Sequence, residues 1–268
     1  MSHRTLEERM VLTVVTDELK MSQPDAFAHL HAWGISYVEF RGLTGGRVPD
    51  GDAEEARRLV QRYGMTVTSI SPGVFKCKPD EREIDEHLGR LRRTIALCPD
   101  FGCRQIIIFT VQDTDAKERP PKLAVQAVKE AGRLAAEAGI RLALENEPGY
   151  TAVGVRSLRQ LIDAVGMDNV GANWDPGNAW PYDPDLDDGP RILGDRVFNV
   201  HAKDTAERNG KRVFDALGRG QVHWRVQVDG LLSVSYAGPF VIETHCEPGV
   251  EKTRMSIEAA RRLLGPSG

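Results

Sequence analysis

Residues 122–145, KLAVQAVKEAGRLAAEAGIRLALE, pass from one helix into one strand. Residues 122–138 have the composition and spacing of an amphipathic helix, and Gly139 stands where such a helix ends. The next residues, 141–145, form a short aliphatic run that we interpret as a strand. A helix followed so closely by a strand is typical of a protein built from βα units around a parallel sheet.

The same alternation recurs along the chain. It predicts eight strands, at residues 12–16, 36–41, 66–71, 105–110, 141–145, 170–175, 197–202 and 240–243. It predicts helices at residues 24–33, 52–63, 83–97, 122–138, 157–165 and 257–264, with two shorter ones at 184–193 and 224–232. Eight βα units in about 250 residues indicate a single (β/α)₈ TIM barrel, an α/β fold. We therefore expect one domain over residues 1–268 and interpret the Pro-rich residues 176–190 as a loop.

Composition and charge exclude several classes of protein. The 268 residues are 41% hydrophobic and 28% charged, which is typical of a globular chain. Thirty-five basic and 39 acidic residues give a net charge of −4, which argues against binding to nucleic acid or anionic lipid. No apolar run approaches the roughly 18 residues of a membrane helix. The charged N-terminus lacks a signal-peptide core, and four scattered cysteines predict free thiols, so we expect a cytoplasmic protein.

Four predicted strands end in side chains that can bind metal: Glu145, Asp175, His201 and Glu243. Active sites of TIM barrels lie at the carboxyl ends of the strands, so these side chains are expected to converge. Each acidic residue alone would be interpreted as a helix cap or a loop charge. Three carboxylates together repel one another unless they splay apart or a divalent ion binds between them. Oxygen ligands with one imidazole suit Mn²⁺, Mg²⁺ or Co²⁺.

Four motifs lie at these strand ends: Leu-Glu145-Asn, Asp175-Pro-Gly-Asn178, His201-Ala-Lys203-Asp204 and Ile-Glu243-Thr. They resemble the sugar phosphate isomerase/epimerase family of xylose-isomerase-like TIM barrels, which includes inosose dehydratases, ketose 3-epimerases and endonuclease IV. The resemblance implies that Glu145, Asp175, His201 and Glu243 bind one divalent metal ion, with Mn²⁺ as first choice and Mg²⁺, Co²⁺ or Zn²⁺ as alternatives. It also implies that Glu145 and Glu243 act as catalytic acid and base. The chain departs from many members at Asn178, where they have His.

The resemblance predicts an isomerase or epimerase of a small sugar, ketose or polyol derivative. A divalent ion would chelate a carbonyl and a neighbouring hydroxyl and stabilise the enediolate left by proton removal. The alternative is a lyase, of the inosose dehydratase type or acting by β-elimination on glycosides, because loss of a β-hydroxyl starts from the same proton abstraction. An abasic-site endonuclease is disfavoured by the net charge and Asn178, and a non-catalytic sugar-binding scaffold by the complete ligand set.

Four further residues are predicted to contact substrate. Strand alternation places Lys203 on the side of His201, with an ion pair to Glu243 or Glu147 as the alternative. Arg41 could bind a carboxylate or phosphate, or form an internal pair with Glu39. The other two predicted contacts are Glu147 and Lys76, both in loops. The expected partner is a small sugar or polyol, with no nucleic acid and no membrane, and a homo-oligomer is left open.

Overall fold

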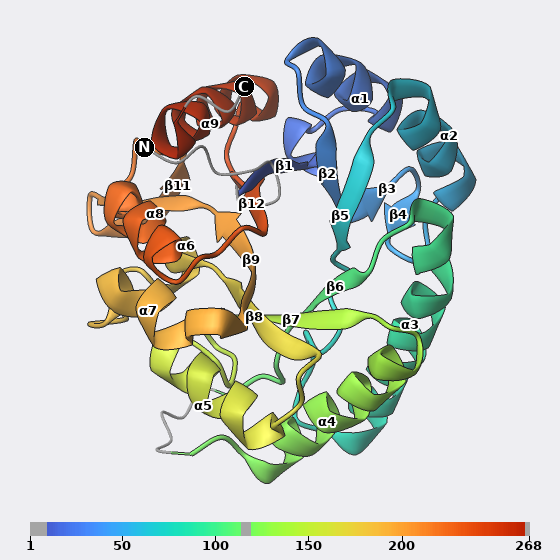
Figure 1. Ribbon diagram of the computed structural model, residues 1–268, viewed down its shortest axis with the longest axis vertical. Helices are drawn as coiled ribbons and strands as arrows, with labels where there is room; N and C mark the ends of the chain where they lie inside the picture. The colour runs from blue at the N-terminus through green and yellow to red at the C-terminus, as the bar shows by residue number, and fades with distance from the viewer. Residues whose placement is uncertain (1–9, 114–118, 266–268) are drawn as a thin grey trace.

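Eight parallel strands close into a barrel in this computed structural model, which describes residues 10–113 and 119–265. The strands follow one another around the barrel in the order β1, β12, β9, β8, β7, β6, β5, β2, which confirms the predicted TIM barrel (Figure 1). Their bounds are β1 Val11–Val15, β2 Tyr37–Phe40, β5 Thr66–Ile70, β6 Gln105–Ile108, β7 Arg141–Glu145, β8 Val170–Trp174, β9 Val197–Ala202 and β12 Pro239–Ile242.

Helices surround the strands, as the βα pattern predicts. The side chains of Ser22, Asp52 and Asp80 accept hydrogen bonds from the first backbone N–H groups of α1, α2 and α3. The helices are α1 Gln23–Ala32, α2 Ala53–Tyr63, α3 Glu81–Leu97, α4 Lys122–Glu137, α5 Val155–Val165, α6 Pro176–Ala179, α7 Gly189–Leu193, α8 Trp224–Ser233 and α9 Gly249–Leu264.

Two helix predictions were wrong in their bounds. The helix predicted at 184–193 is a 3₁₀ turn, η4 (Leu186–Asp188), followed by the short α7, and α6 lies inside the stretch predicted as a loop. Helix α9 begins well before the predicted residue 257. Its first turns bury Thr253 and Ser256, which are polar, so hydrophobic periodicity does not mark them.

Two antiparallel hairpins outside the barrel were not predicted. They pair β3 (Gly42–Leu43) with β4 (Gly46–Arg47), and β10 (Asp204–Arg208) with β11 (Lys211–Asp215). The second hairpin turns at Asn209-Gly210, where φ is 53° and 70°. Asn-Gly favours two-residue hairpin turns because both positions need positive φ, so this signal was present in the sequence.

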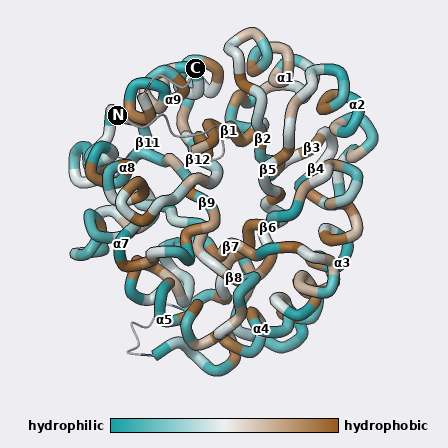
Figure 2. The backbone as a smooth tube through the Cα atoms, in the orientation of Figure 1, coloured by the Kyte–Doolittle hydropathy of each residue, from teal (hydrophilic) through white to brown (hydrophobic). Residues whose placement is uncertain are grey.

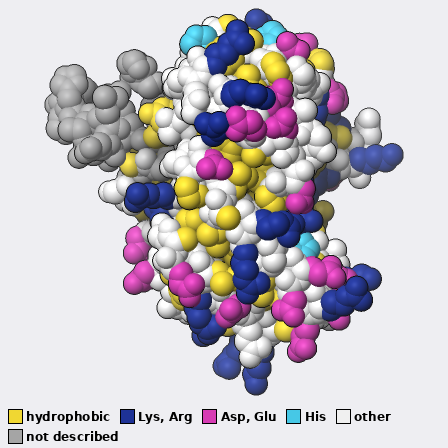
Figure 3. Space-filling view, turned by 90° about the vertical axis from the view of Figure 1, so that its right-hand side faces the viewer, with side chains coloured by type: hydrophobic (Ala, Val, Ile, Leu, Met, Phe, Trp, Pro, Cys, Tyr) yellow, Lys and Arg dark blue, Asp and Glu magenta, His cyan; other side chains and the backbone are white. Residues whose placement is uncertain are grey.

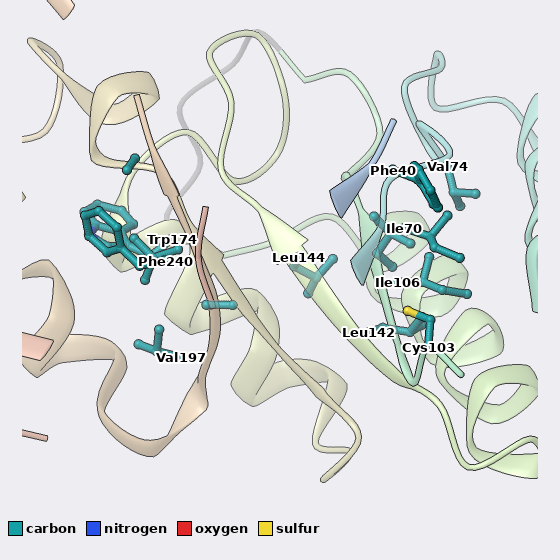
Figure 4. Close-up of a cluster of buried hydrophobic side chains, with 14 of the residues drawn as sticks. Phe40, Ile70, Val74, Cys103, Ile106, Leu142, Leu144, Trp174, Val197 and Phe240 are labelled. Carbon is teal, nitrogen blue, oxygen red and sulfur yellow. The ribbon is translucent and has the colours of Figure 1, made fainter. Parts of the chain in front are cut away.

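The hydrophobic core lies between the strands and the surrounding helices. Apolar residues of the strands, including Leu142 and Leu144 of β7, form one buried cluster with apolar residues of the helices. Figure 4 shows part of this cluster, and Figure 2 shows hydrophobic strands inside a ring of helices with many hydrophilic residues. The buried apolar residues Val15, Ile107, Ala143 and Val241 lie outside the cluster, on the strand faces that point into the barrel.

The outer helix surface is mixed in charge. Figure 3 shows the side of the molecule that carries α2 and α3 in Figure 1, where both Lys and Arg and Asp and Glu side chains are spread around hydrophobic ones. Ion pairs within a helix contribute to this pattern, between Arg57 and Glu54 in α2 and between Arg82 and Glu86 in α3. Within the described ranges, no helix combines the length and apolar character of a membrane span.

Candidate metal centre and active site

The four predicted metal ligands converge at the carboxyl ends of the strands. Glu145 ends β7, His201 lies in β9, and Asp175 and Glu243 directly follow β8 and β12. Asp175 also caps α6, because its Oδ1 accepts the N–H of Asn178 at 2.9 Å. One ligand atom from each of the four residues lies within 4.8 Å of the others, and all four residues are buried. The structure therefore brings together the whole set that the sequence singled out.

The imidazole of His201 is held with one nitrogen facing this cluster. Its Nε2 lies 3.0 Å from Oε1 of Glu39, whose Oε2 accepts a hydrogen bond from Ser69. Its Nδ1 lies 3.2 Å from Glu243 and 3.3 Å from Glu145, yet has no well-formed hydrogen bond with any described residue. A metal-binding histidine usually donates a hydrogen bond from one ring nitrogen to a carboxylate. Its other ring nitrogen then faces the metal ion and the remaining ligand atoms, which here are carboxylate oxygens. The donor set therefore fits a divalent ion.

Electrostatics in the cluster reflect crowding of like charges. Burial raises the pKa of Asp175 to about 6. Burial opposes ionisation of Glu243 as well, but Lys203, His245 and His201 outweigh it and hold the pKa of Glu243 well below its usual range. Burial would lower the pKa of His201, but the carboxylates of Glu39, Glu243 and Glu145 raise it well above its usual value. The carboxylates thus favour added positive charge at this place.

Lys203 supplies part of that positive charge. Its Nζ lies 2.7 Å from Oδ2 of Asp175 and 2.8 Å from Oε2 of Glu243. The sequence analysis gave an ion pair with Glu243 or Glu147 as the alternative to substrate contact, and the structure shows the pair with Glu243. The contact with Asp175 was not predicted. Burial would lower the pKa of Lys203, but these two carboxylates and Glu145 raise it above its usual value. Lys203 is therefore a buried ammonium group in direct contact with two predicted metal ligands.

Arg41, which directly follows β2, reaches the same cluster. Its guanidinium donates to Oε1 of Glu243 at 2.8 Å, to Oε1 of Glu18 at 2.6 Å and to Oδ2 of Asp17 at 3.0 Å. The internal pair with Glu39 considered from the sequence is wrong, because Glu39 is turned to His201 and Ser69. Asp17 and Glu18 were missed, although they directly follow the strand predicted at residues 12–16 and the rule of reading strand ends applies to them.

Arg41 also fills a second group of possible metal ligands. Glu18, Glu243 and His245 offer ligand atoms within 4.8 Å of one another. The Arg41 guanidinium contacts all three, with Nη1 3.2 Å from Nε2 of His245. The guanidinium of Arg41 thus already supplies a positive charge next to the carboxylates of Glu18 and Glu243. It takes the place that a metal ion would have in this second group.

Lys76 and Glu147 lie together and are not members of the buried cluster. Their side chains are partly exposed and form an ion pair of 2.7 Å. The ammonium of Lys76 also lies 4.0 Å from the ring centroid of Phe109. Both residues were predicted to contact substrate; the structure pairs them with each other.

Asparagines hold the carboxylates in place, and the sequence reading had not singled them out for this role. Asn173 and Asn178 donate from Nδ2 to Oε2 and Oε1 of Glu145, at 3.1 and 3.2 Å. The side chain of Asn146 forms two hydrogen bonds with the backbone of Asp175. Its Nδ2 donates to the carbonyl oxygen at 2.8 Å, and its Oδ1 accepts from the N–H at 2.9 Å. Asn173 had a detectable signal, because it lies two residues before Asp175 and therefore shares its strand face.

Comparisons with known proteins agree with this fold. A family model described as "Xylose isomerase-like TIM barrel" matches residues 27–263. An inosose isomerase of Bacillus velezensis is 21% identical over 182 residues, and the match covers 65% of this chain but only 64% of that protein. A crystal structure of IOLI protein with a bound zinc atom has a TM-score of 0.78 at 16% identity, covering 95% of this chain and 98% of that one.

A D-allulose 3-epimerase from Methylomonas sp., solved in complex with D-allulose, has a TM-score of 0.75 at 16% identity. The match covers 95% of this chain and 97% of that one. At these identities the two crystal structures show likeness of fold.

Proposed function

Because the chain belongs to the xylose isomerase-like TIM-barrel family, as its motifs predicted, we propose that it is a divalent-metal-dependent isomerase or epimerase. Its substrate would be a small sugar, ketose or polyol derivative, the class to which the named relatives' substrates belong. The proposal depends most on one observation. The buried Nδ1 of His201 faces three carboxylates that come from three other strand ends.

The residues that would hold the ion are Glu145, Asp175, His201 and Glu243. We propose Mn²⁺, because three carboxylates and one imidazole form a hard, mixed oxygen and nitrogen donor set; Mg²⁺, Co²⁺ and Zn²⁺ are the alternatives. When bound, such an ion supplies a Lewis acid for the carbonyl and neighbouring hydroxyl oxygens of the substrate. Glu39 keeps His201 oriented for this role through its contact with Nε2.

Glu145 and Glu243 are the proposed groups that move the proton. They come from β7 and β12, which are separated by two strands, so they approach the cluster from different directions. Burial opposes their ionisation, but neighbouring cations lower the pKa of both, so each is ionised at neutral pH. One carboxylate removes a proton next to the carbonyl. Protonation of the opposite face by the other carboxylate, after it has taken up a proton from solvent, gives an epimer, and return of the first proton to the adjacent carbon gives an isomer.

Lys203, Arg41, Lys76 and Glu147 are the proposed substrate contacts. Lys203 and Arg41 place fixed positive charges beside Glu243, where a developing oxyanion would be stabilised. Lys76 and Glu147 offer a charged donor and acceptor at a partly exposed position, suited to hydroxyl groups farther along the substrate.

A lyase reaction is the second candidate. The ammonium of Lys203 lies 2.8 Å from Glu243, so a fixed positive charge stands directly beside a proposed base. That charge would stabilise the oxygen of a departing β-hydroxyl, and the proton that Glu243 has removed would complete the water molecule that leaves, which gives dehydration in place of epimerisation. Product analysis with keto-polyols distinguishes the two, because only the lyase product lacks one molecule of water.

The test combines elemental analysis with solvent isotope exchange. We expect about one divalent ion per chain in the wild type, less in Glu243→Gln, and no loss in the matched control Glu147→Gln, because only Glu243 belongs to the buried cluster. Wild-type protein should then incorporate solvent deuterium into a ketose or an inosose. Absence of metal after addition of Mn²⁺ at neutral pH would contradict the proposal, as would metal content that Glu243→Gln leaves unchanged.

A further inference from the structure

A continuous chain of side-chain hydrogen bonds crosses the interior of the barrel. Arg141 donates from Nη2 to Oε1 of Gln105 at 3.2 Å, and Gln105 donates from Nε2 to Oδ1 of Asn199 at 3.1 Å. Asn199 donates from Nδ2 to Oδ1 of Asn173 at 3.0 Å, and Asn173 donates from Nδ2 to Oε2 of Glu145 at 3.1 Å. The chain begins at the first residue of β7 and ends at its last.

This chain cannot run along the surface of the sheet. Gln105 belongs to β6 and Asn199 to β9, and two strands, β7 and β8, separate them around the barrel. Their bond must therefore cross the interior. Gln105, Asn199 and Asn173 are all buried, whereas Arg141 is exposed at the opposite end of β7 from the metal ligands. TIM-barrel interiors are usually filled by branched apolar side chains, so three linked amides here call for an explanation.

The two ends of the chain determine its direction. A guanidinium can only donate hydrogen bonds, and an ionised carboxylate can only accept them. Each amide between them must therefore turn its oxygen toward Arg141 and its NH₂ toward Glu145. Dipoles aligned in this way polarise one another, and all of them place positive charge toward the carboxylate.

We propose that Arg141, Gln105, Asn199 and Asn173 form a directional relay that fixes the orientation of Glu145 and thereby sets the affinity of the metal centre. The inference rests on the proposed metal-dependent function. Asn173 fixes Oε2 of Glu145 directly, while Gln105 and Asn199 are positioning residues that act through Asn173. The relay thus connects an exposed arginine at the far end of the barrel to a proposed metal ligand.

The test is a double-mutant cycle read by Mn²⁺ binding. We expect Asn173→Leu to weaken Mn²⁺ binding by about 10–100-fold, the usual effect of removing a partner of a metal ligand. Gln105→Leu and Arg141→Met should each weaken it by a smaller factor. Because they act through Asn173, each should have no further effect in the Asn173→Leu background.

Gln227→Leu is the matched control. Gln227 is also a buried glutamine with two side-chain hydrogen bonds, to Trp174 and to the backbone of Leu186, but it lies outside the relay. Its substitution should leave Mn²⁺ affinity unchanged. The relay is refuted if Gln105→Leu weakens Mn²⁺ binding no more than Gln227→Leu does. It is also refuted if Gln105→Leu weakens Mn²⁺ binding by the same factor in the wild-type and Asn173→Leu backgrounds. Arg141→Met, at an exposed residue, provides the same comparison if the Gln105 variant does not fold.

A second readout does not depend on metal. In metal-free protein, the side-chain NH₂ resonances of Asn173 should shift in Arg141→Met, although the two residues do not touch. Unshifted resonances would overturn the relay even if Mn²⁺ binds normally. Conversely, a wild type that binds no Mn²⁺, together with this shift in Arg141→Met, would leave the relay standing and contradict the proposed function alone.

Discussion

The two faces of strand β7 differ in almost every property. Leu142 and Leu144 point outward, are fully buried and belong to the hydrophobic core. Arg141, Ala143 and Glu145 alternate with them and point into the barrel, where Arg141 begins the proposed relay and Glu145 joins the proposed metal ligands. A strand places successive side chains on opposite faces. Within five consecutive residues, the side chains on one face of β7 therefore stabilise the core, and those on the other face line the interior of the barrel and its proposed active site.

The same division holds for β2 and β9. Val38 and Phe40 of β2 pack in the core, while Glu39 contacts His201 across the barrel. In β9, Val200 and Ala202 belong to the core. The two faces can thus be altered separately, which makes the difference testable with substitutions of neighbouring residues.

Glu145→Gln should have the largest effect. Turnover is expected to fall by about 10²–10⁴-fold, because an amide cannot exchange a proton with substrate. The free energy of unfolding should fall by less than it does for a core truncation, because the amide keeps the side-chain volume and loses only the attraction to His201 and Lys203 that lowers the pKa of Glu145. Steady-state kinetics and urea unfolding measure the two quantities. A variant with normal turnover would show that Glu145 does not move the proton.

Leu144→Ala, one residue away, should have the opposite profile. Its side chain is fully buried in the core, so truncation should lower the free energy of unfolding by about 2–5 kcal/mol. The folded fraction should keep wild-type Mn²⁺ affinity, because the residue faces away from the cluster. Urea unfolding and Mn²⁺ titration test this pair of expectations. Unchanged stability with weakened metal binding would contradict the division between the two faces.

Mn²⁺ affinity should rise with pH. Metal binding must displace the proton that the carboxylates hold on His201, whose pKa is raised, and below about pH 6 also the proton on Asp175. Each displaced proton contributes about a tenfold change in affinity per pH unit. The expected slope is therefore about one above pH 6 and about two below it. Titrations between pH 5 and pH 8 that show constant affinity would exclude this competition.

Lys76→Met should have the smallest effect on the fold. Its ion pair with Glu147 is partly exposed, so its loss should change the free energy of unfolding by less than about 1 kcal/mol. Because neither residue belongs to the metal cluster, Mn²⁺ binding should stay normal. We expect a raised KM with little change in kcat, measured on whichever sugar proves to be the substrate. A lower kcat at unchanged KM would place Lys76 in the chemical step instead.

Local pattern alone predicted the barrel and the four strand-end residues that converge in it. Hydrophobic periodicity marks strands and helices, and the carboxyl ends of parallel strands must meet at one end of the barrel. The start of α9 escaped prediction because polar residues fill its buried side. The β10–β11 hairpin escaped although its Asn-Gly turn was readable, because the segment follows a barrel strand directly.

The sequence by itself determined which face of each strand a residue occupies, because that depends only on a period of two. Only the tertiary structure decided which side chains meet across the barrel. The partners Glu39 and His201 are 162 residues apart, and Gln105 and Asn199 are 94 apart. Such contacts depend on the stagger of the strands around the closed barrel and on side-chain rotamers, which no local pattern encodes.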